Sequence, residues 1–189
     1  MSGTTEMINV NIEEFIKPVV GKMAWQLMQG YGSFITMEFG LPHLDVSEPV
    51  IFNRSEAPPS VKKNDKATSL FNRRRVFIRG EWHLWIQYCT WSAESHQGKI
   101  ANSNMDLEKN RPILDEIDGQ YVNAIHWDLK KMIIEIVFDL GAKISIGIEP
   151  HTTEGPIMAL YGPENEYLEL RNDKVEDLVA YSGSPDEHF

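Results

Sequence analysis

The sequence has a single cysteine, Cys89, so the chain can form neither an internal disulfide nor a multi-cysteine zinc site. No window approaches the roughly 18 consecutive apolar residues that a membrane-spanning helix needs. The first residues have neither the basic flank nor the apolar core of a signal peptide. We therefore expect a cytoplasmic protein that does not bind membranes.

The sequence also lacks the motifs of the commonest enzyme classes. It contains no Gly-x-Gly-x-x-Gly, no phosphate-binding loop and no Gly-x-Ser-x-Gly nucleophile elbow. Its six histidines form no His-x-His or His-x-x-x-His pair, so we expect no metal site. We predict no catalytic residue and no cofactor, although an unusual enzyme is not excluded by missing motifs.

Acidic residues outnumber basic ones, 28 to 18, which gives a formal net charge of −10. This balance disfavours binding to nucleic acid and is compatible with a basic protein partner. Residues 62–79 have the opposite character, with seven basic residues against one acidic residue, Asp65. This segment is either a solvated linker or a surface that contacts an anion or a partner. In the second case the candidate residues are Arg73, Arg74 and Arg75.

A weak internal duplication is the most informative pattern in the sequence. Residues 15–27 and 113–125 each contain a short apolar helical turn, a glycine and an alternating run. Predicted strands follow at 34–39 and 133–138, and each precedes a glycine. Both glycines are followed eight residues later by the glutamate of a Glu-Pro dipeptide. Residues 81–86 align with 166–170 as the last matching segments.

These patterns predict an α+β protein built mostly from antiparallel β meanders. We expect two pseudo-symmetric repeats, each with a short leading helix, that share one core, because half of such a small meander buries too little surface to be stable alone. A single closed barrel is the alternative. The predicted boundaries are a first repeat at 1–92 with a long insertion at about 50–78, a connector at 93–110, a second repeat at 111–173 and a mobile acidic tail at 174–189.

Residues 81–91 contain three of the five tryptophans and predict one continuous strand. Alternation places Trp82 and its even-numbered neighbours on one face and the odd-numbered residues on the other. The strand is either buried on both faces or presents its odd-numbered face as a polar and aromatic binding surface. The candidate binding residues on that face are His83, Trp85, Gln87 and Trp91. Cys89 lies roughly 20 Å from His83 along such a strand, too far for a thiol–imidazole pair.

The pattern Gly-x-Gly-Ser-Phe-x-Thr-x-Glu-Phe-Gly at 30–40, followed by Gly-Glu-Trp-His-Leu-Trp-Ile at 80–86, resembles uncharacterised small bacterial proteins. The segment 119–148 is similar to short β-rich domains grouped with immunity proteins of bacterial toxin systems. The resemblance covers the β segments of both repeats and excludes residues 50–78. It implies a cytoplasmic binding protein and assigns no catalytic residue.

Together these observations favour a non-enzymatic binding protein, including an immunity protein that neutralises a basic toxin by direct contact. The alternative is a small-molecule-binding protein or an unusual enzyme that uses a cleft between the two repeats. A homodimer built on the aromatic surface of residues 81–91 is a further possibility.

Overall fold

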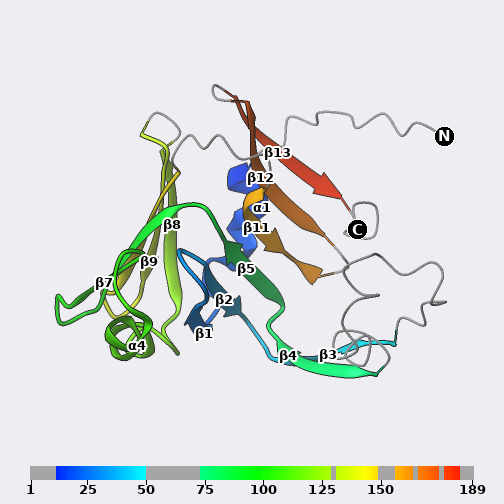
Figure 1. The fold of residues 1–189 in the computed structure, drawn as a ribbon, viewed down its shortest axis with the longest axis horizontal. Coiled ribbons are helices and arrows are strands. Elements are labelled where there is room, and N and C mark those ends of the chain that lie inside the picture. The colour runs from blue at the N-terminus through cyan, green and yellow to red at the C-terminus, as the bar shows by residue number, and fades with distance from the viewer. Residues whose placement is uncertain are drawn as a thin grey trace, which may run out of the picture. The chain divides into compact units, whose positions relative to one another are not determined.

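The computed structural model describes residues 12–49, 73–128, 131–148, 156–163, 166–174 and 177–183. The chain divides into two units, of which Pro42–Arg79 is one and the sequence on either side of it is the other. The larger unit contains two antiparallel β-sheets, and the described residues of the smaller one form a β-hairpin. The elements are labelled in Figure 1.

The first sheet of the larger unit has six strands, and every neighbouring pair is antiparallel. In spatial order they are β1 (Ala24–Gln29), β2 (Ile35–Phe39), β5 (Trp82–Ile86), β11 (Pro156–Tyr161), β12 (Tyr167–Lys174) and β13 (Asp177–Gly183).

The second sheet has five strands, also paired antiparallel throughout. In spatial order they are β7 (Ile100–Asn102), β6 (Thr90–Glu94), β10 (Lys143–Gly147), β9 (Ile133–Phe138) and β8 (Val122–Asp128). The helices of the larger unit are α1 (Ile12–Ile16), the 3-10 helix η1 (Lys17–Val19) and α4 (Leu107–Asp115). The predicted α+β class with mostly antiparallel strands is therefore confirmed.

Both sheets contribute to one hydrophobic core. Every second residue of β9 is buried, as shown by Ile134, Ile136 and Phe138, and the same period of two continues in β10. The leading helices add buried aliphatic side chains from η1 and from the turn after α4. Each fully buried aliphatic or aromatic side chain contributes about 1.5–3 kcal/mol, so the alternating pattern supplies most of the stabilisation.

The predicted single strand over residues 81–91 is wrong. The chain forms β5, turns at residues 87–89 and continues as β6 in the other sheet. Tyr88 has a φ of 55° rather than an extended value, and this left-handed conformation breaks the strand. The turn also changes which residues face the core, because even-numbered residues are buried in β5 whereas Trp91 and Ala93 are buried in β6.

Two predicted boundaries differ from the observed elements. The expected connector at 93–110 includes the end of β6, all of β7 and the start of α4. Residues 177–183 were expected in a mobile tail, but they form β13, whose backbone pairs with β12. The acidic residues of the predicted tail at 174–189 had favoured a mobile segment over a strand. In the expected insertion, residues 75–79 form strand β4, whereas residues 50–72 and 184–189 lie outside the described residues.

The segments that lead into β1 and β8 pair with each other through reciprocal backbone hydrogen bonds. Residues that occupy equivalent positions in the two segments are 98 positions apart in the sequence. Gly21 and Gly119 are one such pair, and their φ values are 85° and 88°. The bonds are Gly21 N–H to Val122 O (2.8 Å), Gly119 N–H to Ala24 O (2.8 Å), Ala24 N–H to Gln120 O (2.8 Å) and Val122 N–H to Lys22 O (2.9 Å). This is the pattern of a local two-fold axis.

The strand orders of the two sheets correspond in the same way. The neighbours β1, β2, β5 and β11 of the first sheet match β8, β9, β10 and β6 of the second. By this correspondence β5 matches β10, so the sequence alignment of residues 81–86 with 166–170, which lie in β12, does not reflect equivalent positions. The smaller unit is inserted between β2 and β5, where the other sheet has only the short turn at Gly141 between β9 and β10.

Gly80, the residue that follows the inserted unit, makes the closest backbone approach. A Cβ atom at this position would lie 2.5 Å from Phe39 O and 2.8 Å from Phe39 N. We expect Gly80→Ala to lower the free energy of unfolding by roughly 2–3 kcal/mol, because backbone atoms cannot move aside as a flexible side chain can. Urea denaturation followed by tryptophan fluorescence measures the effect.

Gly98→Ala is the control for this variant. Gly98 has a φ of 75° and open space around its Cα, so alanine there adds backbone strain without a clash. We expect it to cost about 1 kcal/mol. Equal costs at the two positions would contradict the close approach at Gly80.

Candidate functional site

The outward-facing side of the six-stranded sheet carries the most distinctive group of side chains. In one cross-strand row, Glu38 of β2, His83 of β5, Tyr161 of β11 and Tyr167 of β12 lie directly opposite one another. The row beside it contains Trp85 and Glu169. We call these six residues the outer aromatic face. Because side chains alternate along a strand, this face lies opposite the one that contributes Met37, Leu84 and Leu160 to the core.

Glu38 and His83 are in close contact at one end of this face. The Nδ1 atom of His83 lies 2.8 Å from Oε1 of Glu38, although the ring approaches outside hydrogen-bond geometry. The other carboxylate oxygen, Oε2, accepts a hydrogen bond of 2.9 Å from the backbone N–H of Gly80. Only 3% of Glu38 is exposed, so these contacts compensate part of the cost of burying a carboxylate.

Three rings stack across neighbouring strands beside this pair. The ring centroids of His83 and Tyr161 are 6.0 Å apart with planes inclined by 24°, and those of Tyr161 and Tyr167 are 6.3 Å apart at 21°. Trp85 packs on Phe34 at 6.1 Å. Aromatic pairs of this kind contribute about 0.5–1.5 kcal/mol beyond the area they bury. The face therefore combines ordered flat rings with carboxylates.

Burial raises the pKa of the Tyr161 hydroxyl above its ordinary value, and the negative charge of Glu169 raises that pKa further. Tyr161 therefore remains a neutral hydrogen-bond donor at physiological pH. Among the residues that the structure describes, no group of three or more His, Cys, Asp or Glu side chains could hold a metal ion.

The structure brings together two of the four residues predicted on the strand 81–91. His83 and Trp85 lie on the outer aromatic face. Gln87 is buried at the turn between the sheets, where its backbone N–H donates to Ile157 O at 2.9 Å. Trp91 is 2% exposed in β6, and its indole N–H donates to Ser33 O at 3.0 Å. The four do not share a face because the turn at Tyr88 separates them.

Sequence reasoning missed the cross-strand partners of His83 and Trp85. Glu38 is buried where its strand, β2, pairs with β5. Tyr161, Tyr167 and Glu169 come from strands more than seventy residues further along the chain. Only the pairing of β5 with β11 would have identified them, and local patterns do not predict non-local pairing.

The predicted arginine group lies in the smaller unit, where two of its members contact their own hairpin. Arg74 makes a forked ion pair with Glu48, with Nε 2.9 Å from Oε1 and a terminal nitrogen 3.0 Å from Oε2. The guanidinium of Arg75 lies 5.6 Å from the centre of the Phe77 ring. Arg73 is exposed.

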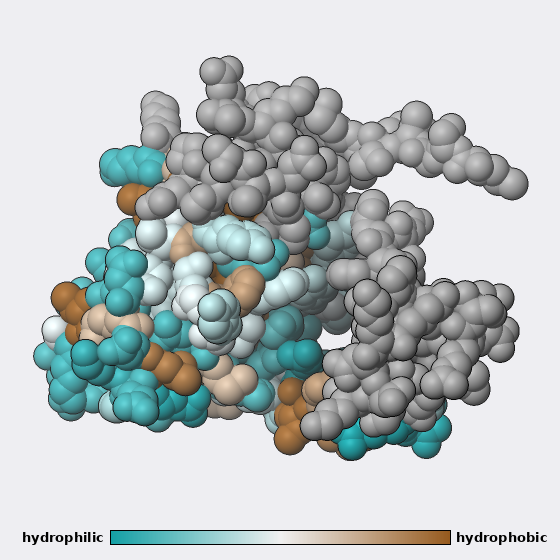
Figure 2. Space-filling view, in the orientation of Figure 1, coloured by the Kyte–Doolittle hydropathy of each residue, from teal (hydrophilic) through white to brown (hydrophobic). Residues whose placement is uncertain are grey.

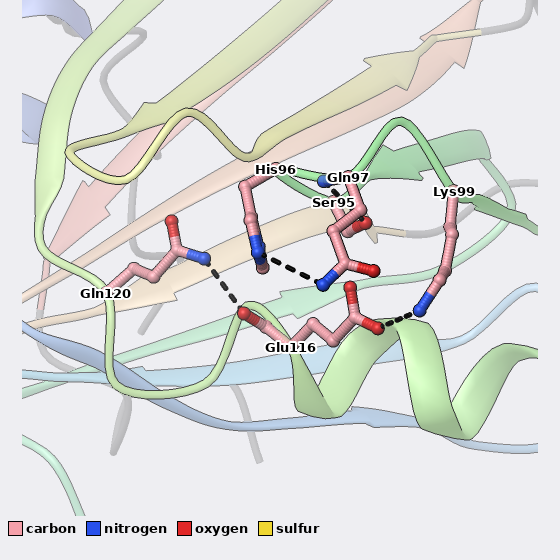
Figure 3. A network of polar contacts seen from close by, with 6 residues as sticks. All are labelled: Ser95, His96, Gln97, Lys99, Glu116 and Gln120. Atoms are coloured by element: carbon pink, nitrogen blue, oxygen red, sulfur yellow. Dashed lines mark hydrogen bonds and ion pairs between the residues drawn. The ribbon is translucent and has the colours of Figure 1, made fainter.

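A separate polar network joins the β6–β7 turn to the end of α4, as Figure 3 shows. Lys99 Nζ lies 2.5 Å from Oε1 of Glu116, and the side-chain amide of Gln120 donates to the backbone oxygen of Glu116 at 2.8 Å. The hydrogen bond from Lys99 is the largest cause that lowers the pKa of Glu116. These contacts fasten a turn to a helix, and they lie apart from the residues of the outer aromatic face.

The core also contains a small apolar cavity of about 30 Å³. Residues of both sheets and of the leading helix line it, including Val19, Leu84, Trp127 and Ile146, and all the lining residues are hydrophobic. Neither His83 nor Trp85 lines it. Its lining therefore includes none of the binding residues predicted in the segment 81–91.

Comparison of the chain with protein-family models, with curated proteins and with solved structures finds no match. No helix within the described part of the chain is both long enough and apolar enough to cross a membrane.

The raised pKa of Tyr161 is testable by alkaline titration. The difference in phenolate absorbance between the wild type and Tyr161→Phe should place Tyr161 above the ordinary pKa of about 10. Because tyrosine in the unfolded chain ionises first, the stabilisation from neutral Tyr161 is fully present below about pH 10 and is lost as the pH rises from there through the raised pKa of the folded protein. Glu169→Gln should lower the pKa of Tyr161 only part of the way, since burial is the larger cause. A return to the ordinary value would contradict that order of causes.

Proposed function

We propose that this chain is a non-enzymatic binding protein whose outer aromatic face takes a basic protein partner. The observation that carries the proposal is the group of partly exposed side chains His83, Trp85, Tyr161 and Glu169 on neighbouring strands, in which the rings of His83 and Tyr161 stack. Tyrosine and tryptophan are among the residues that contribute most to binding at protein interfaces. Carboxylates beside aromatic rings favour lysine and arginine side chains, which bind both groups.

The net charge of −10 supports the same class of partner, because an acidic protein accelerates its encounter with a basic one. We infer that the partner is a toxin of a bacterial system, as the sequence resemblance of residues 30–40, 80–86 and 119–148 implies. The cytoplasm is the compartment we propose, since the one cysteine, Cys89, is buried and belongs to no disulfide.

We also infer that the larger unit arose by duplication of one β unit. The reciprocal hydrogen bonds around Gly21 and Gly119 support this, and so does the matching strand order of the two sheets. In this arrangement each repeat contributes strands to both sheets, as two subunits that exchange an element do. The buried pairs Ile16 and Leu114, and Val19 and Ile117, again lie 98 positions apart.

A small-molecule ligand in the core is the weaker alternative. The apolar cavity, at about 30 Å³, has room for only one or two water-sized groups. The outer aromatic face offers several ordered polar and aromatic groups at once, and it therefore supports a protein partner better.

Binding to the products of genes adjacent to the one encoding this chain tests the proposal. We expect one basic product to bind, and Trp85→Ala to raise its dissociation constant at least about 30-fold, which corresponds to an interface residue contributing 2 kcal/mol. Tyr31→Ala is the matched control, because Tyr31 is an exposed aromatic residue outside the outer aromatic face. Biolayer interferometry measures both constants, and co-expression should relieve growth arrest by the same product. Equal effects of the two substitutions would contradict the proposed interface.

Strand exchange between the repeats predicts that neither half folds alone. Residues 1–104 contain β6 and β7, which need β10, and residues 105–189 contain β11 to β13, which need β5. We expect each fragment to lack a cooperative thermal transition in circular dichroism and the co-expressed pair to recover one. A cooperative transition of 105–189 by itself would show that the second half has its own core.

A further inference from the structure

The hairpin of the smaller unit has one aliphatic face that is exposed in the chain. Strand β3 (His43–Ser47) pairs with β4 (Arg75–Arg79), so that Leu44 lies opposite Ile78 and Val46 opposite Val76. These four residues share one face, and they are exposed by 67%, 58%, 45% and 56% respectively. Figure 2 shows hydrophobic atoms at the surface over this hairpin. We call the four residues the aliphatic row.

The charged groups of the hairpin strands lie on the reverse face. His43 is opposite Arg79, Asp45 is opposite Phe77, and Ser47 is opposite Arg75. The guanidinium groups of Arg75 and Arg79 lie 5.6 and 5.5 Å from the centre of the Phe77 ring, one on each side of it in sequence. The aliphatic row itself contains no ionisable residue. Two such faces can therefore meet without bringing like charges together.

A two-stranded hairpin is marginally stable in water by itself and needs a second layer over its apolar face. Two β-sheets meet this need by packing face to face about 10 Å apart with their apolar side chains between them. An uncharged row of leucine, isoleucine and valine is complementary to itself. A second copy of the chain, related by a two-fold axis, supplies the missing layer with the same four residues.

We propose that the aliphatic row is the interface of a weak homodimer, in which the hairpins of two copies pack face to face. Four half-exposed aliphatic side chains bury on the order of 400 Å² per copy, about half of the 800 Å² per partner in a standard interface. The interface is therefore of the small, transient class, with a dissociation constant on the order of 100 µM. This contact is independent of the partner proposed for the outer aromatic face.

Sedimentation equilibrium of the full chain over a range of concentrations tests the dimer. We expect a monomer–dimer equilibrium that Ile78→Ser weakens at least about tenfold, because a buried aliphatic group is lost. Phe77→Ser is the matched control, since it removes an adjacent apolar side chain from the reverse face. All five tryptophans lie outside the hairpin, so their fluorescence checks that the larger unit of each variant remains folded.

Two further measurements distinguish this interface from other occupants of the aliphatic row. Association should persist between about 50 and 500 mM NaCl, because screening reduces repulsion between the basic hairpins and leaves apolar contacts intact. Val76→Cys places a thiol in the aliphatic row and should form a covalent dimer under mild oxidation. Phe77→Cys places a thiol on the reverse face and should not. The natural cysteine does not interfere in either variant, because it is buried.

A monomer at every concentration would overturn the proposal, as would a dimer that Ile78→Ser leaves unchanged or that salt dissociates. Binding of a monomer to anionic lipid vesicles through the row would overturn it in favour of a membrane.

Discussion

The passage of the chain from one sheet to the other is the constraint on which the larger unit depends. At residues 87–89 the chain leaves β5 and enters β6, and between β10 and β11 it crosses in the opposite direction. Each sheet therefore contains strands from both halves of the sequence. Neither half of the sequence contains a whole sheet, and an incomplete sheet buries too little apolar surface to offset its loss of conformational entropy. The shared core removes this limit because the apolar faces of both sheets pack into one cluster.

The same crossing determines the composition of the outer aromatic face. His83 and Trp85 face outward because the even-numbered residues of β5 are required in the core. After the left-handed turn at Tyr88 the odd-numbered residues face inward, and Trp91 becomes a core residue. A row of aromatic residues in the sequence is thus divided between a surface and a core. The partly exposed Tyr161 and Glu169 that lie beside them come from β11 and β12.

Local patterns in the sequence were sufficient to predict some elements and insufficient for others. The alternation at residues 34–39 and 133–138 is a property of short segments, and the strands predicted there are confirmed as β2 and β9. The place of β13 and the burial of Glu38 depend on pairing between distant segments, for which charge content is a poor guide. In β4, Val76 and Ile78 alternate with Arg75, Phe77 and Arg79, which is a pattern typical of a strand. The excess of basic residues in 62–79 instead favoured interpreting this segment as a linker.

The position of the inserted unit explains how the fold accommodates it. The chain leaves the first sheet after Leu41 and returns at Gly80, at the end of the β2–β5 pair, where the other sheet has a short turn. Glu81 fixes this end of the sheet, because its carboxylate accepts from Leu41 N–H at 3.2 Å and pairs with Lys22 at 2.8 Å. With both chain ends held there, the described strands of the inserted unit, β3 and β4, pair with each other. The hairpin could therefore acquire an exposed aliphatic face without a cost to the stability of the core, as interaction surfaces on loops commonly do.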